Sequence, residues 1–138
     1  MVENKNYYSV VLEQEYHDGE IILEEGKSGD WVCILLSGTA EVSKKLSGRK
    51  VVLGILKVGE IFGELALIGA VKRTATVRAI GNTTVGIIDR AFLDYELNKM
   101  SSGFRAILVT AVQRYIKMMD RDQDVSSRIN DRVRKEVN

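Results

Sequence analysis

The sequence predicts a mainly β domain followed by C-terminal helices, and two observations indicate this fold class. Eleven of the twelve glycines precede residue 90, where they separate short runs rich in β-branched residues. After Asp89 the apolar residues recur instead at helical spacing. Short strands separated by glycine turns are typical of antiparallel sandwiches and barrels. The 138 residues suffice for one such domain with one appended element.

The strands are expected wherever a β-branched run lies between two turn signals, giving a β-roll of about eight strands. The runs that meet this condition are YSVVLEQEY, EIILEE, WVCILLS, TAEVSKK, KVVLGILK, TATVRAI and TTVGIID. Side chains alternate between the two faces of a strand. In TAEVSKK we therefore expect Ala40 and Val42 to face inward, and Glu41 and Ser43 to face outward.

Two helices are expected after the strands. A short one is indicated by Ala91, Phe92, Tyr95 and Leu97, and a long one begins near Ser101–Gly103. The long helix carries a broad apolar stripe, formed by Ile107, Leu108, Ala111, Val112, Tyr115, Ile116 and Met119. The tail from Asp120 to Asn138 is compatible with a solvated helical extension, a coiled-coil seam or a linker.

A heptad-like pattern in this arm predicts a parallel homodimer. Asp122 and Ser126 interrupt the pattern. From Phe104 to about Arg134 the helix would be about 45 Å long, too long for one small β-roll to bury. The residues of the expected seam are Leu108, Val112, Tyr115, Met119, Ile129 and Val133.

Composition argues against several classes of function. The net charge of +1 gives no basic excess for neutralising phosphates, so no direct nucleic-acid binding is expected. His17 is the only histidine, which argues against a metal site, a metal cofactor and a cupin-like enzyme. Cys33 is the only cysteine, expected in the core, and it fits a cytoplasmic location. No signal peptide and no membrane span are expected, because the apolar runs are too short.

The segment from Ile61 to Val77 combines the residue types that bind a phosphorylated sugar. Gly63 precedes a helix-forming run and lets a ligand approach the backbone. The backbone N–H groups of residues 64 to 66 are expected to point out of a helix N-terminus toward an anion. Arg73 follows Glu64 by nine residues. A guanidinium binds phosphate oxygens as a fork, and a carboxylate accepts from sugar hydroxyls.

FGELALIGAVKRTATVRA resembles the phosphate-binding cassette of the cyclic-nucleotide-binding domain family, the type found in kinase A regulatory subunits and the catabolite activator protein. HDGEIILEEGKSGDWVCILLSGTAEV resembles the opening strands of that family, and the likeness covers roughly residues 16 to 98. It implies a β-roll, a double-stranded jelly-roll-like barrel, over residues 1–98 with the cassette at 61–77. Residues 99–138 would form a helical arm that acts as a lid, a dimerisation element or a linker to an output domain.

The resemblance also implies a function and a set of site residues. The chain would be a sensor for cAMP, or alternatively cGMP, and not an enzyme. Glu64 would hold the ribose 2′-hydroxyl and Arg73 the cyclic phosphate. The backbone of Gly63, Leu65 and Ala66 would line the phosphate and the sugar, with Thr74 and Ala75 after the arginine, and Val42 and Leu53 as apolar walls for the base.

One departure, one residue with two readings and one rival interpretation accompany the resemblance. Lys72 replaces the usual proline before the arginine. Thr74 permits a contact with the guanine amino group, yet it is also an ordinary β-branched residue at the start of a strand. The rival is a degenerate relative that serves as a dimerisation or protein-interaction module, with Glu64 and Arg73 joined in a structural salt bridge.

Overall fold

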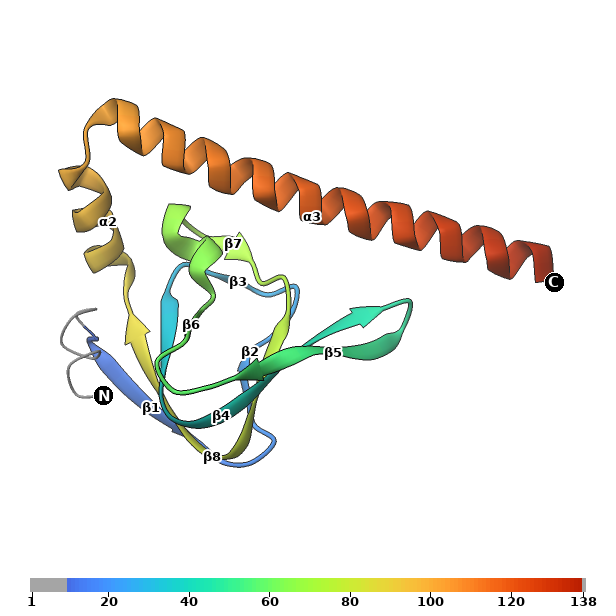
Figure 1. The fold of residues 1–138 in the computed structure, drawn as a ribbon, viewed down its shortest axis with the longest axis horizontal. Coiled ribbons are helices and arrows are strands. Elements are labelled where there is room, and N and C mark those ends of the chain that lie inside the picture. Colours follow the sequence, from blue (N-terminus) through green and yellow to red (C-terminus); the bar gives the residue numbers. More distant parts are fainter. Residues whose placement is uncertain (1–9, 138) are drawn as a thin grey trace.

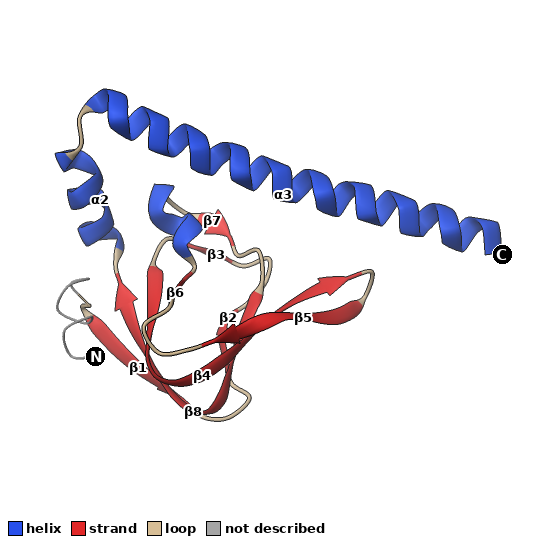
Figure 2. Cartoon of the chain, in the orientation of Figure 1, coloured by secondary structure: helices blue, strands red, loops and turns tan. Residues whose placement is uncertain are grey.

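The computed structural model describes residues 10–137, and of residues 120–137 it describes only the helical backbone. The expected fold class is confirmed, with strands first and helices after them (Figure 2). The strands are β1 (Leu12–Tyr16), β2 (Ile21–Leu23), β3 (Ser28–Gly29), β4 (Val32–Leu46), β5 (Arg49–Leu56), β6 (Ile61–Phe62), β7 (Val71–Lys72) and β8 (Thr76–Ile88). The helices are the 3₁₀ helix η1 (Glu64–Ile68), α2 (Arg90–Lys99) and α3 (Ser102–Val137).

The long antiparallel pair of β4 and β8 forms the centre of the larger sheet. Its order is β1-β8-β4-β5, with β2 also on β8 and β6 also on β4, while β3 and β7 form a separate two-stranded sheet. The expected closure into a barrel is wrong for the described strands, because β1 and β5 lie at opposite ends of this order and do not pair. The sheet curves into an open roll (Figure 1).

Two features of β4 differ from the expected strands. WVCILLS and TAEVSKK form the single strand β4, and pairing with β8 shifts register on both sides of Ser37, next to Gly38 at φ 85°. Ser43 is buried at 5% exposure, so its expected outward position is wrong. At Val42 and Ser43 the pairing of β4 with β8 is regular, whereas the pairing with β5 skips Leu53.

A tight hairpin connects β4 to β5 and extends that pair away from the roll (Figure 1). Leu46 pairs with Arg49 across a two-residue turn, in which Ser47 and Gly48 have φ angles of 56° and 77°. Positive φ angles at both central residues define a type I′ turn, whose twist matches the twist of the flanking strands. In the described residues β5 has β4 as its one neighbour and forms an edge of the sheet.

The core consists of two apolar clusters, one within the roll and one beneath the short helices. Cys33 and Leu35 on β4 and Val85 on β8 belong to the first, and all three are fully buried. The expected core position of Cys33 is confirmed, and burial raises the pKa of its thiol to about 12. In the second cluster Ala66 of η1 packs with Leu93 of α2. This packing places the cassette helix against the start of the C-terminal helices.

The two expected helices are present at the expected places. Asp89 caps α2 by accepting from the Phe92 amide at 3.1 Å, and the Ser101 hydroxyl accepts from the Phe104 amide in the first turn of α3. α3 crosses above η1 and β7, and its C-terminal half extends beyond the roll (Figure 1). Within the described residues, none of the helices is both long enough and apolar enough to cross a membrane.

Candidate functional site

The Arg73 side chain lies between two segments that are distant from each other in the sequence. Its Nη1 donates to the Gly63 carbonyl at 3.3 Å, and its Nη2 donates to the Trp31 carbonyl at 2.9 Å. The guanidinium carbon lies 4.7 Å from the centre of the Trp31 ring, a cation–π distance. Only 7% of Arg73 is exposed. These contacts hold the buried guanidinium of Arg73 in a fixed position.

Two glycines make room for this guanidinium. A Cβ on Gly29 would lie 2.5 Å from Arg73 Nη2, and a Cβ on Gly63 would lie 2.9 Å from Arg73 Nη1. Gly63 also has φ 70°, a conformation that an L side chain rarely adopts. The close approach to the backbone that was expected of a ligand at Gly63 is made by the guanidinium of Arg73.

The cassette helix is a single 3₁₀ segment whose backbone differs from the expectation in one respect. The Ala66 N–H donates to the Gly63 carbonyl at 3.2 Å, so its expected availability to an anion is wrong. The cause is the tight i→i+3 pattern of a 3₁₀ turn, which uses this N–H within the turn itself. Glu64 begins the segment with an exposed side chain, Leu65 is half-buried and Ala66 is fully buried.

Glu64 and Arg73 lie close enough to interact electrostatically, yet they form no ion pair in the described part of the chain. Burial lowers the pKa of Arg73, while Cys33, Asp30 and Glu64 act in the opposite direction. The structural salt bridge of the rival interpretation is therefore not formed. Glu64 keeps an exposed carboxylate near a buried guanidinium, an arrangement suited to a ligand that has both hydroxyl and anionic groups.

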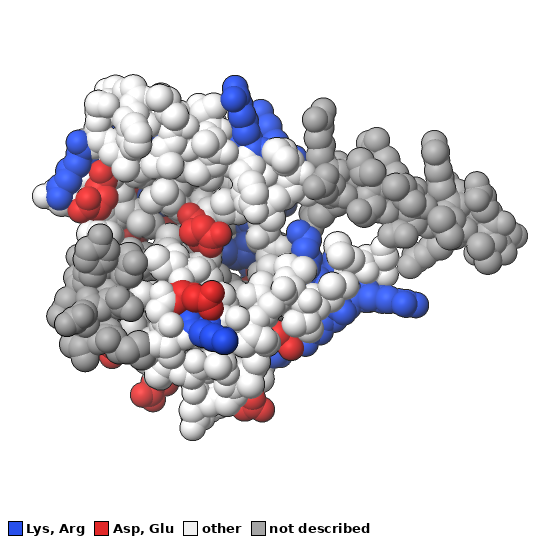
Figure 3. Space-filling model, in the orientation of Figure 1, with Lys and Arg blue, Asp and Glu red and all other residues white. Residues whose placement is uncertain are grey.

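A cleft with a volume of about 140 Å³ opens beside the arginine. Three cations, Lys44, Lys72 and Arg73, line it together with Glu25, Gly26, Thr74 and Met119. Figure 3 shows Lys and Arg atoms in the hollow near the centre of this face. Met119 belongs to α3, so the arm contributes one wall of the cleft. The cleft therefore combines positive charge with an apolar surface from a separate element.

The loop that carries Arg73 is fixed by backbone hydrogen bonds to the turn before β3. The Gly26 N–H donates to the Arg73 carbonyl and the Arg73 N–H donates to the Lys27 carbonyl, both at 2.8 Å. Next to these bonds the Glu25 N–H donates to the Thr76 hydroxyl at 3.0 Å, and the Glu25 carboxylate accepts from the Lys45 amide at 2.9 Å. These contacts set the position of Arg73 and Thr74 relative to the end of β4.

Of the residues expected at the site, only Arg73 and Thr74 are among those that line the cleft. Val42 is half-buried on β4 and packs against the first core cluster. Leu53 lies on the edge strand β5, next to Gly54, the residue that pairs with Val42, and it is 57% exposed. Ala75 is half-buried in the bend after Thr74. An apolar wall formed by Val42 and Leu53 stays a prediction.

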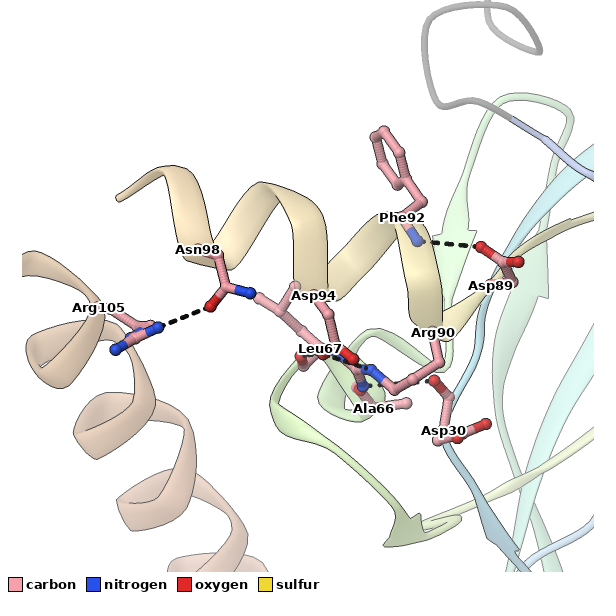
Figure 4. Close-up of polar contacts among 9 residues, drawn as sticks. All are labelled: Asp30, Ala66, Leu67, Asp89, Arg90, Phe92, Asp94, Asn98 and Arg105. Carbon is pink, nitrogen blue, oxygen red and sulfur yellow. Dashed lines mark hydrogen bonds and ion pairs between the residues drawn. The ribbon is translucent and has the colours of Figure 1, made fainter. Parts of the chain in front are cut away.

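A second arginine ties the cassette to the helices (Figure 4). Arg90, the first residue of α2, donates from Nη1 to the Ala66 carbonyl and from Nη2 to the Leu67 carbonyl at 2.7 Å. Its Nε donates to Asp94 at 2.9 Å. Farther along, Arg105 of α3 donates to the side-chain oxygen of Asn98 at 2.8 Å. Polar contacts thus connect η1 to α2, and α2 to α3.

Sequence reasoning missed several residues of this site. Gly29 and Trp31 precede Arg73 by more than forty positions, and Trp31 was expected only as part of an apolar strand. Lys44 was expected only as part of the strand TAEVSKK, and Met119 as part of the apolar stripe and the seam. Nothing in the local pattern distinguishes these positions, because each acquires its role through tertiary contacts.

The cyclic nucleotide-binding domain model matches residues 13–99 of the chain. A cAMP-dependent protein kinase regulatory subunit from Mycosarcoma maydis is 40% identical over 85 residues, which cover 57% of this chain and 16% of that protein. A cGMP-dependent protein kinase from Toxoplasma gondii is 36% identical over 107 residues, covering 77% of this chain and 10% of the kinase. The cGMP-bound form of the EAL enzyme Bd1971 superimposes with a TM-score of 0.66 at 27% identity, over 75% of this chain and 28% of that one.

Proposed function

Because the chain belongs to the cyclic nucleotide-binding domain family, we propose that it binds a 3′,5′-cyclic purine nucleotide through Arg73 and Glu64 and thereby controls the position of α3. In this proposal the chain is a binding and regulatory module rather than an enzyme. It spans only a small part of the relatives described above, so an output domain or a partner protein, such as the catalytic part of a kinase, belongs to the proposal.

One observation carries the proposal. Arg73 is a buried cation whose two hydrogen bonds go to neutral carbonyl groups, with no carboxylate at ion-pair distance among the described residues. A buried charge without a counter-charge is costly. An anion that enters the adjacent cleft would remove this cost. A cyclic phosphate carries one negative charge and two exocyclic oxygens, which match the remaining donors of a guanidinium.

The rest of the ligand would fit the groups around this anchor. The exposed Glu64 carboxylate would accept from the ribose 2′-hydroxyl. Thr74 and Met119 line the cleft and would contact the purine, with Val42 and Leu53 as candidate walls on β4 and β5. We favour cAMP as the natural ligand, with cGMP permitted by the Thr74 hydroxyl. The known relatives include kinases named for each nucleotide.

The coupling between the nucleotide site and α3 is proposed from the contacts that connect them. Arg90 donates to a carbonyl group of η1, and Arg105 donates to Asn98 (Figure 4). Met119 lines the cleft. A ligand shifts a conformational balance only through its different affinity for the two states. A nucleotide that contacts Met119 would bind more tightly to the state in which α3 covers the cleft. Occupancy would therefore favour this position of the arm.

A homodimer through the arm is also part of the proposal, as the heptad-like pattern predicts. The structure divides the expected seam between two surfaces. Leu108, Val112 and Met119 are half-buried on the side toward the roll, whereas Tyr115 is exposed. Ile129 and Val133 lie outside the residues whose side chains are described. A cytoplasmic setting is proposed from the free, buried Cys33 thiol.

Thermal unfolding tests the proposal against its rivals. A ligand present at a hundredfold excess over its Kd stabilises the folded state by about 2.7 kcal/mol, a shift of several degrees in Tm. We expect cAMP and cGMP to raise Tm, and 5′-AMP, whose phosphate is not cyclised, to have little effect. No response to any nucleotide would favour the degenerate interaction module. A response to divalent metals alone would favour a metal-dependent barrel enzyme.

A further inference from the structure

A cavity with a volume of about 240 Å³ lies against the first core cluster, on the side of β1. Cys33 of β4, which is fully buried, forms its floor together with Ile87 of β8, the residue that pairs with Cys33. Leu12 and Gln14 of β1 form one wall, and both of these residues are exposed. The cavity is therefore open to solvent along β1 and closed at the centre of the sheet. It is called the β1 cavity below.

The described side chains that line the β1 cavity include no charged group. Besides the four named above, they are those of Tyr16, Ile22 and Trp31. Burial raises the pKa of the Tyr16 hydroxyl above its ordinary value and the pKa of the Cys33 thiol to about 12, so both groups are neutral at physiological pH. A charged ligand would lose its hydration here without gaining a counter-charge, which is costly. The β1 cavity therefore selects for an uncharged ligand.

The size and the polar groups of the β1 cavity narrow this ligand further. An apolar cavity of roughly 150 Å³ is large enough to bind benzene, so the β1 cavity has room for one aromatic ring with a short substituent. The Tyr16 hydroxyl donates to Gln14 Oε1 at 2.7 Å. The Tyr16 oxygen can still accept a hydrogen bond, and the Gln14 amide nitrogen can still donate one. The Trp31 side chain supplies aromatic surface, which favours a second ring.

Trp31 connects the β1 cavity to Arg73. It lines the cavity, and the centre of its ring lies 4.7 Å from the guanidinium carbon of Arg73. Cys33 on the floor of the cavity also interacts electrostatically with Arg73. The β1 cavity and the cleft share no lining residue. They are therefore separate spaces, and Trp31 is the side chain through which an occupant of the β1 cavity would reach Arg73.

We propose that the β1 cavity binds a small uncharged aromatic molecule with one hydrogen-bonding group, and that this molecule raises the nucleotide affinity of the cleft through Trp31. A ring packed on Trp31 would favour the state in which Trp31 contacts Arg73, because it binds that state more tightly. Linkage then requires the nucleotide to raise the affinity for the aromatic molecule by the same factor. The coupling rests on the proposed nucleotide function, whereas the binding of the aromatic molecule does not.

Calorimetry of the full chain with two matched probes tests the ligand class. Benzyl alcohol has one ring and one hydroxyl, and benzylamine has nearly the same shape but is positively charged at neutral pH. We expect saturable binding of benzyl alcohol with a Kd of about 1 mM or tighter. Benzylamine should bind at least about tenfold more weakly, because its ammonium group would be desolvated. No saturable binding of benzyl alcohol, or equal affinity for both probes, would overturn the inference.

Two measurements test where the probe binds. Gln14→Phe places a ring in the wall of the β1 cavity, and Val11→Phe places the same ring on a neighbouring exposed position that does not line it. We expect Gln14→Phe to abolish benzyl alcohol binding and Val11→Phe to retain it. In the wild type, 4-bromobenzyl alcohol should quench the fluorescence of Trp31, the only tryptophan, because bromine quenches at contact distance. Binding that survives Gln14→Phe, or that leaves Trp31 unquenched, would refute this location.

Titration of cAMP with and without saturating benzyl alcohol tests the coupling. In the wild type and in Val11→Phe we expect benzyl alcohol to tighten cAMP binding at least about fivefold, and cAMP to tighten benzyl alcohol binding by the same factor. In Gln14→Phe the cAMP affinity should not respond to benzyl alcohol. An unchanged cAMP affinity in a wild type that has bound benzyl alcohol would contradict the coupling. A chain that binds benzyl alcohol in the β1 cavity but binds no nucleotide would contradict the proposed function and leave the β1 cavity as a ligand site.

Discussion

The Arg73 guanidinium stacks on the Trp31 ring at 4.7 Å and donates to the Trp31 carbonyl at 2.9 Å. The ring contact and the hydrogen bond together restrain the orientation of the guanidinium. The backbones of Gly29 and Gly63 also lie directly against it, since a Cβ at either position would clash with its nitrogen atoms. Such a rigid donor loses little conformational entropy on binding.

The first prediction concerns this fork. Arg73→Lys keeps the charge but removes the planar donor set and the stack on Trp31. A charge-assisted hydrogen bond contributes about 1.5–3 kcal/mol, so the loss of one should weaken cAMP binding about tenfold or more. Lys72→Ala is the matched control, since it removes an exposed cation from the rim of the same cleft. Calorimetry should show a much smaller loss for the control. Wild-type affinity in Arg73→Lys would mean that Arg73 does not hold the phosphate.

A second prediction concerns the ribose. Glu64→Gln should weaken cAMP binding less than Arg73→Lys does, because an amide oxygen still accepts a hydrogen bond from the 2′-hydroxyl. The analogue 2′-deoxy-cAMP should bind poorly to the wild-type chain and lose little more on the Glu64→Gln background. This non-additivity is the expected sign of a direct contact. If the affinity losses caused by removing the 2′-hydroxyl and by Glu64→Gln simply add across the four combinations of nucleotide and protein, Glu64 does not contact the 2′-hydroxyl.

The third prediction concerns the choice between guanine and adenine as the base of the bound nucleotide. If the Thr74 hydroxyl contacts the guanine amino group, Thr74→Ala should weaken cGMP binding by about 1 kcal/mol, the usual contribution of one hydrogen bond, and leave cAMP nearly unchanged. Competition of each unlabelled nucleotide against one fluorescent analogue measures both affinities on the same protein sample. An equal loss for both nucleotides would indicate a packing effect in the bend before β8.

A fourth prediction concerns the space around Arg73. Gly63→Ala should lower the free energy of unfolding by about 1 kcal/mol or more, because its φ of 70° is strained for alanine, and should also weaken nucleotide binding, because the new methyl group would displace Arg73 Nη1. Gly54→Ala is the control, since a Cβ there meets nothing within 4 Å and its φ is not in the positive region. Urea unfolding and cAMP titration measure the two effects. A stable Gly63→Ala variant with wild-type affinity would remove the reason for glycine at this position.

The fold was predictable from the sequence because its signals are local. Glycine turns separate the strands, Asp89 caps α2, and apolar spacing identifies α3 from Ser102 onward. The joining of WVCILLS and TAEVSKK into β4 was not predictable. A glycine with a positive φ, such as Gly38, occurs both in turns between two strands and in bends within one strand. The buried position of Ser43 was not predictable either, because the elements that cover a face of a strand are not specified by the strand alone.

Part of the candidate site was also predictable, because its signals are local in the sequence. Gly63, Glu64 and Arg73 occur in one short segment, and their residue types indicate the chemistry. Gly29, Trp31 and Met119 join the site only after the chain has folded, since the first two come from the end of β3 and the connection to β4 and the third from α3. The division of α3 into two surfaces also needed the roll in place. Helical spacing alone does not tell which apolar positions face it.

Isothermal titration of the full chain with cAMP and cGMP side by side tests the central claim most directly. We predict saturable one-site binding of at least one nucleotide with a Kd in the range of about 0.1–100 μM, which corresponds to roughly −10 to −5 kcal/mol. A properly folded chain that gives no heat and no competition with either nucleotide at millimolar concentration would contradict the claim.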